Sequence, residues 1–252
     1  MTPAVVAAVA AVALLYASVG HAGATGYIAV MTLAGLDPAV IRPTALVLNV
    51  VVATIATAQF ARAGHFDRGL FLPLAVASVP CAVAGGALAL SPAVFHTILG
   101  IVLGASAVKV IVEALGAPRV PTSEPVSAWW SGRSSGRQLA LGALGGAIGL
   151  LSGLTGVGGG VFLTPVMLAV RAAPVRTVAA VTAPFILVNS LSGLVGGLVA
   201  GRPLPAPGIA VVAAAAVGGA AGAWLGAFRL PVRAIRLLIA AVLAVASWRL
   251  LL

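Results

Sequence analysis

The sequence predicts an all-α polytopic membrane protein made of two inverted repeats, each a glycine-broken re-entrant helix hairpin followed by three transmembrane helices. Three observations predict this fold. Of the 252 residues, 62% are hydrophobic and 7% are charged, whereas a soluble domain has about 25% charged residues. Apolar stretches long enough to cross a membrane recur along the whole chain. The two halves also share an ordered series of features: a glycine-rich break, a short apolar piece, a proline and an asparagine inside an apolar stretch.

The first repeat is expected over residues 1–115. Its first apolar stretch lacks the basic segment that precedes a cleavable signal, so we interpret it as the first membrane segment. A short apolar piece, 27–36, follows the first glycine break. As a helix it would rise only about 15 Å, too little to cross a core of about 30 Å, so we expect it to turn back inside the membrane. The long stretches of this repeat are 3–19, 43–61, 69–90 and 92–114.

A polar linker is expected over residues 116–136, which contain three prolines and five serines. Its Trp129 and Trp130 suit the headgroup level of a bilayer. The second repeat follows over residues 137–252, and its short piece after a glycine break is 161–170. The long apolar stretches of this repeat are 138–154, 178–200, 206–228 and 231–252.

The basic residues predict the orientation of the chain. The net charge is +10, but Lys and Arg lie singly or in pairs between apolar stretches, which disfavours a nucleic-acid surface and is typical of membrane edges. If each glycine break reverses the chain, eleven of the fourteen basic residues flank turns on one side. If the second break lets the chain continue, the division is eight to six. The positive-inside rule favours reversal, which predicts a multi-pass protein of the bacterial inner (plasma) membrane with both termini outside.

The two glycine breaks are the candidate site. The second break, 155–160, reads TGVGGG, and such a run lets consecutive N–H groups converge while the following short helix directs its positive dipole end to the same point. This arrangement suits an anion. The first break, 20–26, can offer the same donors together with the side chains of Thr25 and His21. The competing interpretation is close helix packing, which we assign to the pairs Gly100/Gly104, Gly142/Gly146 and Gly222/Gly226.

Asn49 and Asn189 are the only asparagines, and each lies inside an apolar stretch. Burying an amide without a hydrogen bond costs about 1–3 kcal/mol, so each needs a partner. Two interpretations stay open: a hydrogen bond between helices, or a pair that faces the breaks and binds substrate oxygens. His21 likewise either couples protons or packs as a neutral imidazole. The single cysteine, Cys81, excludes an internal disulfide.

Carboxylates are missing from the middle of every apolar stretch. The four acidic residues lie at the ends of stretches or in the linker: Asp37, Asp67, Glu113 and Glu124. This pattern disfavours a cation pump and an enzyme that needs paired carboxylates, so no catalytic residue is expected. No cluster of His, Asp or Cys predicts a metal site, and no motif predicts a cofactor.

Four segments resemble the TauE/SafE (TSUP) sulfite exporter family of membrane transporters: LTGVGGGVFLTPVM at 154–167, RPTALVLN at 42–49, FARAGHFD at 60–67 and FILVNSLSG at 185–193. The resemblance covers nearly the whole chain. It departs from the family where Ala22 and Ala24 replace glycines of the first break, and where Ala29 corresponds to Pro165. The family pattern carries over to Gly23, Thr25, Asn49, Thr155, Gly158, Gly159, Gly160 and Pro165.

This resemblance implies a secondary transporter for a small sulfur-containing oxyanion, either sulfite or an organosulfonate. We expect alternating access to an anion near the middle of the membrane, between the two breaks and without a buried arginine. Its partners would be this anion and the lipid bilayer, with no nucleic acid; a homo-oligomer stays open. The alternatives are a non-transport membrane scaffold or assembly protein, an anion channel, a metal-ion permease and an intramembrane enzyme. The expected substrate-binding residues are Gly23, Thr25, Asn49, Thr155, Gly158, Gly159, Gly160 and Asn189.

Overall fold

The computed structural model describes residues 2–88, 134–204 and 206–231, with single positions at 108, 234, 237, 238, 241, 244 and 248. Within these residues the regular structure consists of eight α-helices and one π-helical turn. Five of the helices are long and apolar enough to cross a membrane, which confirms the prediction of a polytopic α-helical protein. Several predictions lie outside the described residues: the span 92–114, the linker up to residue 133 with its tryptophans, Gly100, Gly104, Glu113, Glu124 and most of 231–252.

The first half contains two short helices and two long ones: α1 (Pro3–Ala17), α2 (Ala24–Leu33), α3 (Pro38–Arg62) and α4 (Arg68–Ala87). Helix α1 starts with a proline, whose missing N–H costs nothing at the first helical position. Helix α4 starts after Asp67, whose carboxylate accepts hydrogen bonds from the N–H groups of Gly69 (2.7 Å) and Leu70 (3.2 Å). Asp67 is therefore a helix cap in the turn between α3 and α4.

The second half repeats this order of helices: α7 (Ser135–Thr155), α8 (Gly160–Ala169), α9 (Val175–Val199) and α10 (Ile209–Trp224), which continues into the π-helical turn Leu225–Arg229. Helix α7 starts after Ser134, whose hydroxyl accepts the N–H of Arg137 at 3.2 Å. The helix therefore begins two residues before 137, the expected start of the second repeat. Both ten-residue helices, α2 and α8, follow glycines as the sequence predicts, but α2 begins three residues before the expected start at 27 and α8 one residue before 161.

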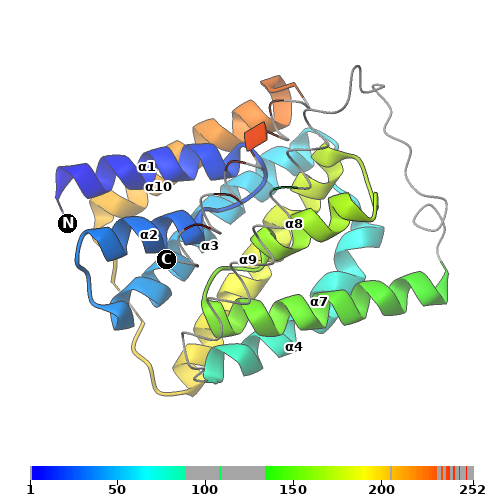
Figure 1. Cartoon of the computed structure of the whole chain (residues 1–252), viewed down its shortest axis with the longest axis horizontal. Coiled ribbons are helices and arrows are strands. Elements are labelled where there is room, and N and C mark those ends of the chain that lie inside the picture. The colour runs from blue at the N-terminus through cyan, green and yellow to red at the C-terminus, as the bar shows by residue number, and fades with distance from the viewer. Residues whose placement is uncertain are drawn as a thin grey trace.

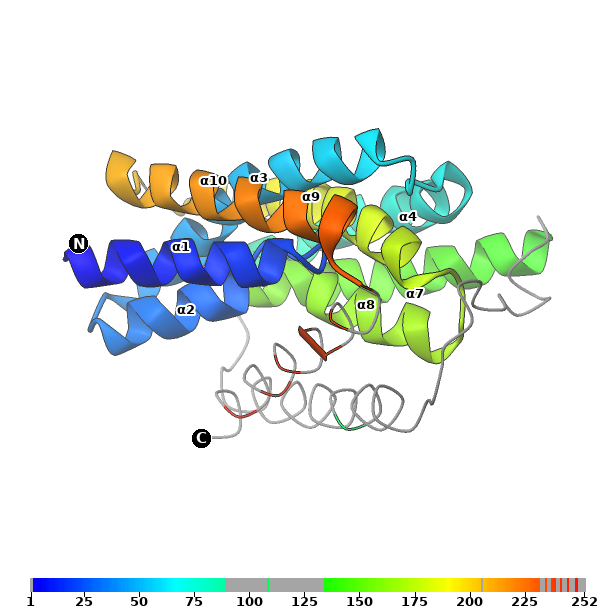
Figure 2. The same cartoon turned by 90° about the horizontal axis from the view of Figure 1, so that it is seen from above.

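The helices pack in equivalent pairs in the two halves. Helix α1 lies along α10, α7 lies along α4, and α3 and α9 cross in the centre, where α3 also packs on α10 and α9 on α4 (Figure 1, Figure 2). Figure 1 shows α1 and α7 entering from opposite sides of the molecule and ending near its middle. Both glycine breaks therefore lie in the interior of the bundle.

Glycines allow two of these helix pairs to approach closely. On α7, the glycines that face α4 are Gly145, Gly149 and Gly153; on α10, those that face α1 are Gly218, Gly222 and Gly226. A Cβ at any of these six positions would overlap a backbone carbonyl of the neighbouring helix. The packing role predicted for Gly222 and Gly226 is confirmed. The same prediction for Gly142 and Gly146 is wrong, because an added Cβ there would meet no atom closer than 3.5 Å.

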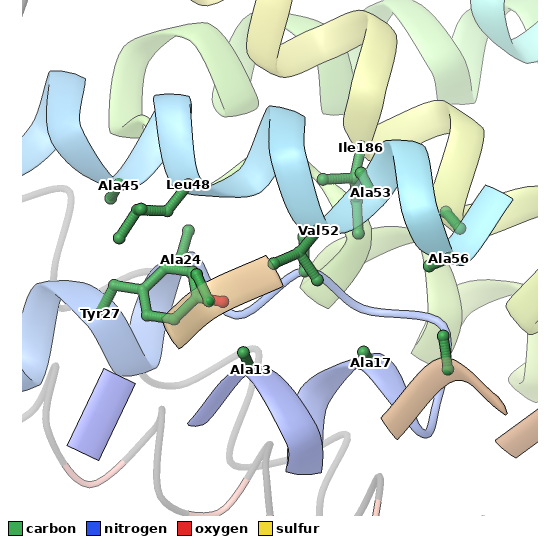
Figure 3. Close-up of a cluster of buried hydrophobic side chains, with 14 of the residues drawn as sticks. Ala13, Ala17, Ala24, Tyr27, Ala45, Leu48, Val52, Ala53, Ala56 and Ile186 are labelled. Carbon is green, nitrogen blue, oxygen red and sulfur yellow. The ribbon is translucent and has the colours of Figure 1, made fainter. Parts of the chain in front are cut away.

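A buried hydrophobic cluster surrounds the first break and joins it to the centre of the bundle. Figure 3 shows Tyr27 of α2 beside small residues of α1 and facing the side chains of Leu48 and Val52 on α3. Ile186 of α9 belongs to the same cluster, so the second half contributes to the packing around the first break. The two halves therefore share one apolar interior.

Candidate functional site

The second break is built from three glycines in a left-handed conformation. Helix α7 ends at Thr155, and Gly156, Gly158 and Gly159 have φ angles of +73°, +84° and +83° before α8 begins. Other residues rarely adopt these angles, so the conformation explains the glycine run. The hydroxyl of Thr155 accepts the N–H of Val157 at 3.1 Å and donates to the carbonyl oxygen of Ser152 at 3.4 Å. Thr155 therefore stabilises the turn itself.

Four consecutive N–H groups at this break have no protein partner. Within the described part of the chain, no hydrogen bond is made by the N–H groups of residues 158–161. The N-cap of α8 is Gly159, which has no side chain to satisfy them. These donors lie at the positive end of the α8 dipole, so the break has the features that bind anions at helix N-termini.

Asn49 of α3 covers this break. Its Nδ2 donates to the carbonyl oxygen of Val157 at 3.2 Å and to the Ser190 hydroxyl of α9 at 3.3 Å. The side chain is fully buried, and its Oδ1 has no hydrogen-bond partner among the residues that the structure describes. A Cβ at Gly158 would lie 2.6 Å from Asn49 Nδ2, so the backbone passes as close to the amide as a glycine permits.

Two further residues at the break did not follow from the sequence. Ser152 is fully buried one helical turn before Gly156, and its hydroxyl has no hydrogen-bond partner in the described part of the chain. Arg42 of α3 is half-buried, donates from Nη2 to the Gly153 carbonyl, and lies across Gly156. Arg42 is thus a half-buried cation beside this break, where the sequence predicted a site without a buried arginine. The spacing could have revealed it, because Arg42 precedes Asn49 by two helical turns and shares its face of α3.

The first break lies against the second half of the chain. Gly20 and Gly23 have φ angles of +78° and +103°, and His21 between them is buried. Its Nε2 lies 2.8 Å from the hydroxyl of Thr164 on α8, which in turn lies 3.1 Å from the hydroxyl of Thr182 on α9. The His21 ring also lies beside the backbone of Gly160. His21 thus connects the two breaks directly.

A side chain of α2 links the two helices that flank the first break. Thr25 donates from Oγ1 to the hydroxyl of Tyr16 on α1 at 2.9 Å. The hydroxyl of Tyr27 is buried and has no partner among the described residues, and a Cβ at Gly23 would lie 3.1 Å from it. In the described part of the chain, the N–H groups of residues 22–26 make no hydrogen bond either. The first break therefore offers free donors and an unpaired hydroxyl.

The hydrogen bonds of Asn189 within the described residues go to α4 and to its own helix rather than to a glycine break. Its Oδ1 accepts the Ser78 hydroxyl of α4 at 2.5 Å, and its Nδ2 donates to the Phe185 carbonyl of its own helix at 2.8 Å. Both ends of the amide are therefore used between α4 and α9. The structure brings Asn49, Thr155 and Gly158–Gly160 together and adds His21 from the first break. Within the described residues no group of three His, Cys, Asp or Glu gathers to hold a metal ion.

Together, these helices and breaks define a polytopic α-helical membrane protein with two half-length helices that start at free N–H groups in its interior. The chain belongs to the sulfite exporter TauE/SafE family, a family of membrane transporters, which matches residues 5–250. It is 37% identical over 244 residues to the "Probable membrane transporter protein y4hK" of Sinorhizobium fredii (strain NBRC 101917 / NGR234), covering 95% of this chain and 94% of that protein. No solved structure is significantly similar to it.

Proposed function

We propose that this chain is a secondary transporter of a small sulfur-containing oxyanion, sulfite or an organosulfonate, in the bacterial inner membrane. The observation that carries the proposal is the row of unpaired N–H groups at residues 158–161, which lies at the start of α8 in the interior of the protein. Unsatisfied donors at membrane depth are tolerated where they line a cavity or bind a ligand. The family to which the chain belongs supports the sulfur oxyanion as this ligand.

The binding residues proposed at the second break are the N–H groups of Gly158, Gly159 and Gly160, with Asn49 above them. The Ser152 hydroxyl, which is buried and unpaired, is a further donor. Thr155 has a supporting role, because its hydroxyl already bonds within the turn. Neutral N–H and hydroxyl donors bind an anion more strongly in a low-dielectric interior than they do in water.

At the first break, Gly23 and Thr25 line the same interior region from the opposite half, with His21 between the breaks. A proton taken up by His21 would change the charge between them, which makes this residue the candidate for proton coupling. We assign Asn189 to the interface between α4 and α9, since its amide has no free atom.

Inverted repeats would supply alternating access. The paired packing of α1 with α10 and of α4 with α7, and the opposite directions of α1 and α7 in Figure 1, support repeats over residues 1–115 and 137–252 joined by the linker 116–136. A break at midplane would then open to one side when one half rocks against the other. The distribution of basic residues supports both termini outside.

A thermal-shift screen of the purified protein with sulfite, sulfate, thiosulfate, taurine and sulfoacetate tests the proposal. A bound anion raises the unfolding midpoint because it stabilises the native state by RT ln(1 + [L]/Kd). A scaffold or assembly protein gives no shift with any of the five anions. An anion channel is distinguished in proteoliposomes, because unlabelled substrate on the far side accelerates uptake by a transporter and does not accelerate uptake through a channel.

A further inference from the structure

We infer that Arg42 supplies a positive charge to the anion at the second break, so that this site prefers doubly charged inorganic oxyanions over singly charged organosulfonates. The inference rests on the proposed function and narrows its substrate class. Three observations support it: the position of Arg42 beside the second break, the alanine that takes its place at the first break, and the nearby Arg202.

The guanidinium of Arg42 has N–H groups at the break that bond to no acceptor among the described residues. Its side chain crosses Gly156, where an added Cβ would lie 3.1 Å from its Nε, and it makes its one hydrogen bond within the described residues to the Gly153 carbonyl. A guanidinium has five N–H donors. The same face of α3 carries Asn49, whose Nδ2 donates to the Val157 carbonyl of the break, and Ser152 of α7 adds a buried hydroxyl that has no partner among the described residues. Charged and neutral donors therefore border one short stretch of backbone.

Among the described residues, no arginine occupies the equivalent place at the first break. Gly20 corresponds to Gly156 in the repeat, and a Cβ at Gly20 would meet Ala179 of α9 at 2.5–2.7 Å. Alanine thus occupies the place that the arginine side chain occupies at the second break. The two breaks differ in charge although their backbones match, so the second is the stronger site for an anion.

Arg202 lies close enough to Arg42 for the two guanidinium groups to repel each other. Arg202 donates to the carbonyl oxygens of Ala87 and Leu88 at 3.3 and 3.4 Å, after the end of α4. Neither arginine forms an ion pair with a carboxylate in the described part of the chain. A bound dianion would relieve the repulsion between these charges more than a monoanion does.

The test compares the affinity of the purified full-length protein for thiosulfate, a dianion, and methanesulfonate, a monoanion, by titration calorimetry at pH 7.5. Arg42→Gln removes the charge but keeps an amide that can donate to the Gly153 carbonyl. Arg42→Lys keeps the positive charge but loses the planar guanidinium with its paired N–H donors. Arg62→Gln removes an exposed arginine from the same helix and is the matched control.

We expect wild type to bind thiosulfate at least tenfold more tightly than methanesulfonate. Arg42→Gln should lower this ratio at least fivefold, whereas Arg42→Lys and Arg62→Gln should keep it. Equal weakening of both anions in Arg42→Gln would mean that Arg42 only caps α7, and this would overturn the inference. So would an unchanged ratio, or a lost preference in a folded Arg42→Lys protein. If wild type binds methanesulfonate or taurine as tightly as thiosulfate, the inference fails while the proposed function stands; if it binds no oxyanion, both fail.

Discussion

The imidazole Nε2 of His21 lies 2.8 Å from the hydroxyl oxygen of Thr164, a residue 143 positions further along the chain. His21 belongs to the first glycine break, and Thr164 lies one turn into the helix that starts at the second. The bond joins the two breaks through buried groups, since both side chains are about 1% exposed. This bond is a direct contact between the first break and the helix that follows the second.

Thr164→Val should destabilise the protein, because the isosteric side chain leaves the buried His21 Nε2 without a partner. A buried group that loses its hydrogen bond costs about 1–3 kcal/mol. The measurement is thermal unfolding in detergent. Thr54→Val is the control, because Thr54 is exposed and bonds only to the Val50 carbonyl of its own helix. Equal stability of the Thr164 variant and wild type would contradict the importance of this bond.

Gly149→Ala should disrupt the packing of α7 on α4. An added Cβ would overlap the Ser78 carbonyl and lie 2.6 Å from the Ser78 hydroxyl, so the helices must move apart. Overpacking of this kind costs about 1–3 kcal/mol. Gly142→Ala on the same helix should be neutral or stabilising, because its Cβ would meet no atom closer than 3.9 Å and alanine is the better helix former. Relative to wild type, the unfolding midpoint should fall in Gly149→Ala and stay equal or rise in Gly142→Ala. Equal midpoints of the two variants would contradict this packing.

Asn49→Ala and Asn189→Ala should separate binding from stability. Asn189→Ala leaves the Ser78 hydroxyl unpaired and should lower the unfolding midpoint, while the anion-induced shift persists. Asn49→Ala should reduce or abolish that shift, because the amide lies over the free N–H groups at residues 158–161. The thermal-shift assay with and without sulfite reports both quantities. Loss of binding in the Asn189 variant alone would show that Asn189, and not Asn49, belongs to the anion site.

His65, in the turn between α3 and α4, should make stability depend on pH. Burial and, to a smaller extent, the nearby Arg176 guanidinium hold the pKa of His65 below its ordinary value, which is about 6.5. The unfolded chain then binds a proton more readily than the folded protein, so stability falls as the pH drops through about 6.5. Unfolding midpoints at pH 7.5 and 5.5 should differ less in His65→Gln than in wild type. An identical difference in both proteins would exclude this role.

The sequence predicted the helices well because their apolar stretches and breaks are local features. Residues 161–170 were expected to form a short helix after a glycine run, and α8 covers Gly160–Ala169. Gly158 and Gly159 were expected to permit an irregular turn, and both have positive φ. Such features depend on neighbouring residues alone, so a single sequence reveals them.

The partners of the polar side chains could not be predicted from the sequence, because they depend on how helices cross. Asn49 and Asn189 look alike in the sequence, but one contacts the second break and the other contacts α4. The closest-packed glycines of α7 were misassigned for the same reason: a Cβ at Gly145 or Gly149 would overlap the α4 backbone, whereas one at Gly142 or Gly146 would make only ordinary van der Waals contact with α4. Arg42 was counted as a charge at a membrane edge, although its side chain reaches the break.

The most direct test of the account is the flux of radiolabelled sulfite into proteoliposomes that contain wild type or Asn49→Asp. The aspartate is nearly isosteric, but its carboxylate would occupy the N–H donors proposed to hold the substrate. We expect wild type to carry sulfite well above protein-free vesicles, and Asn49→Asp, eluting from gel filtration as wild type does, to carry at least tenfold less. Flux of the variant equal to that of wild type, or no wild-type flux above protein-free vesicles, would contradict an anion site at the second break.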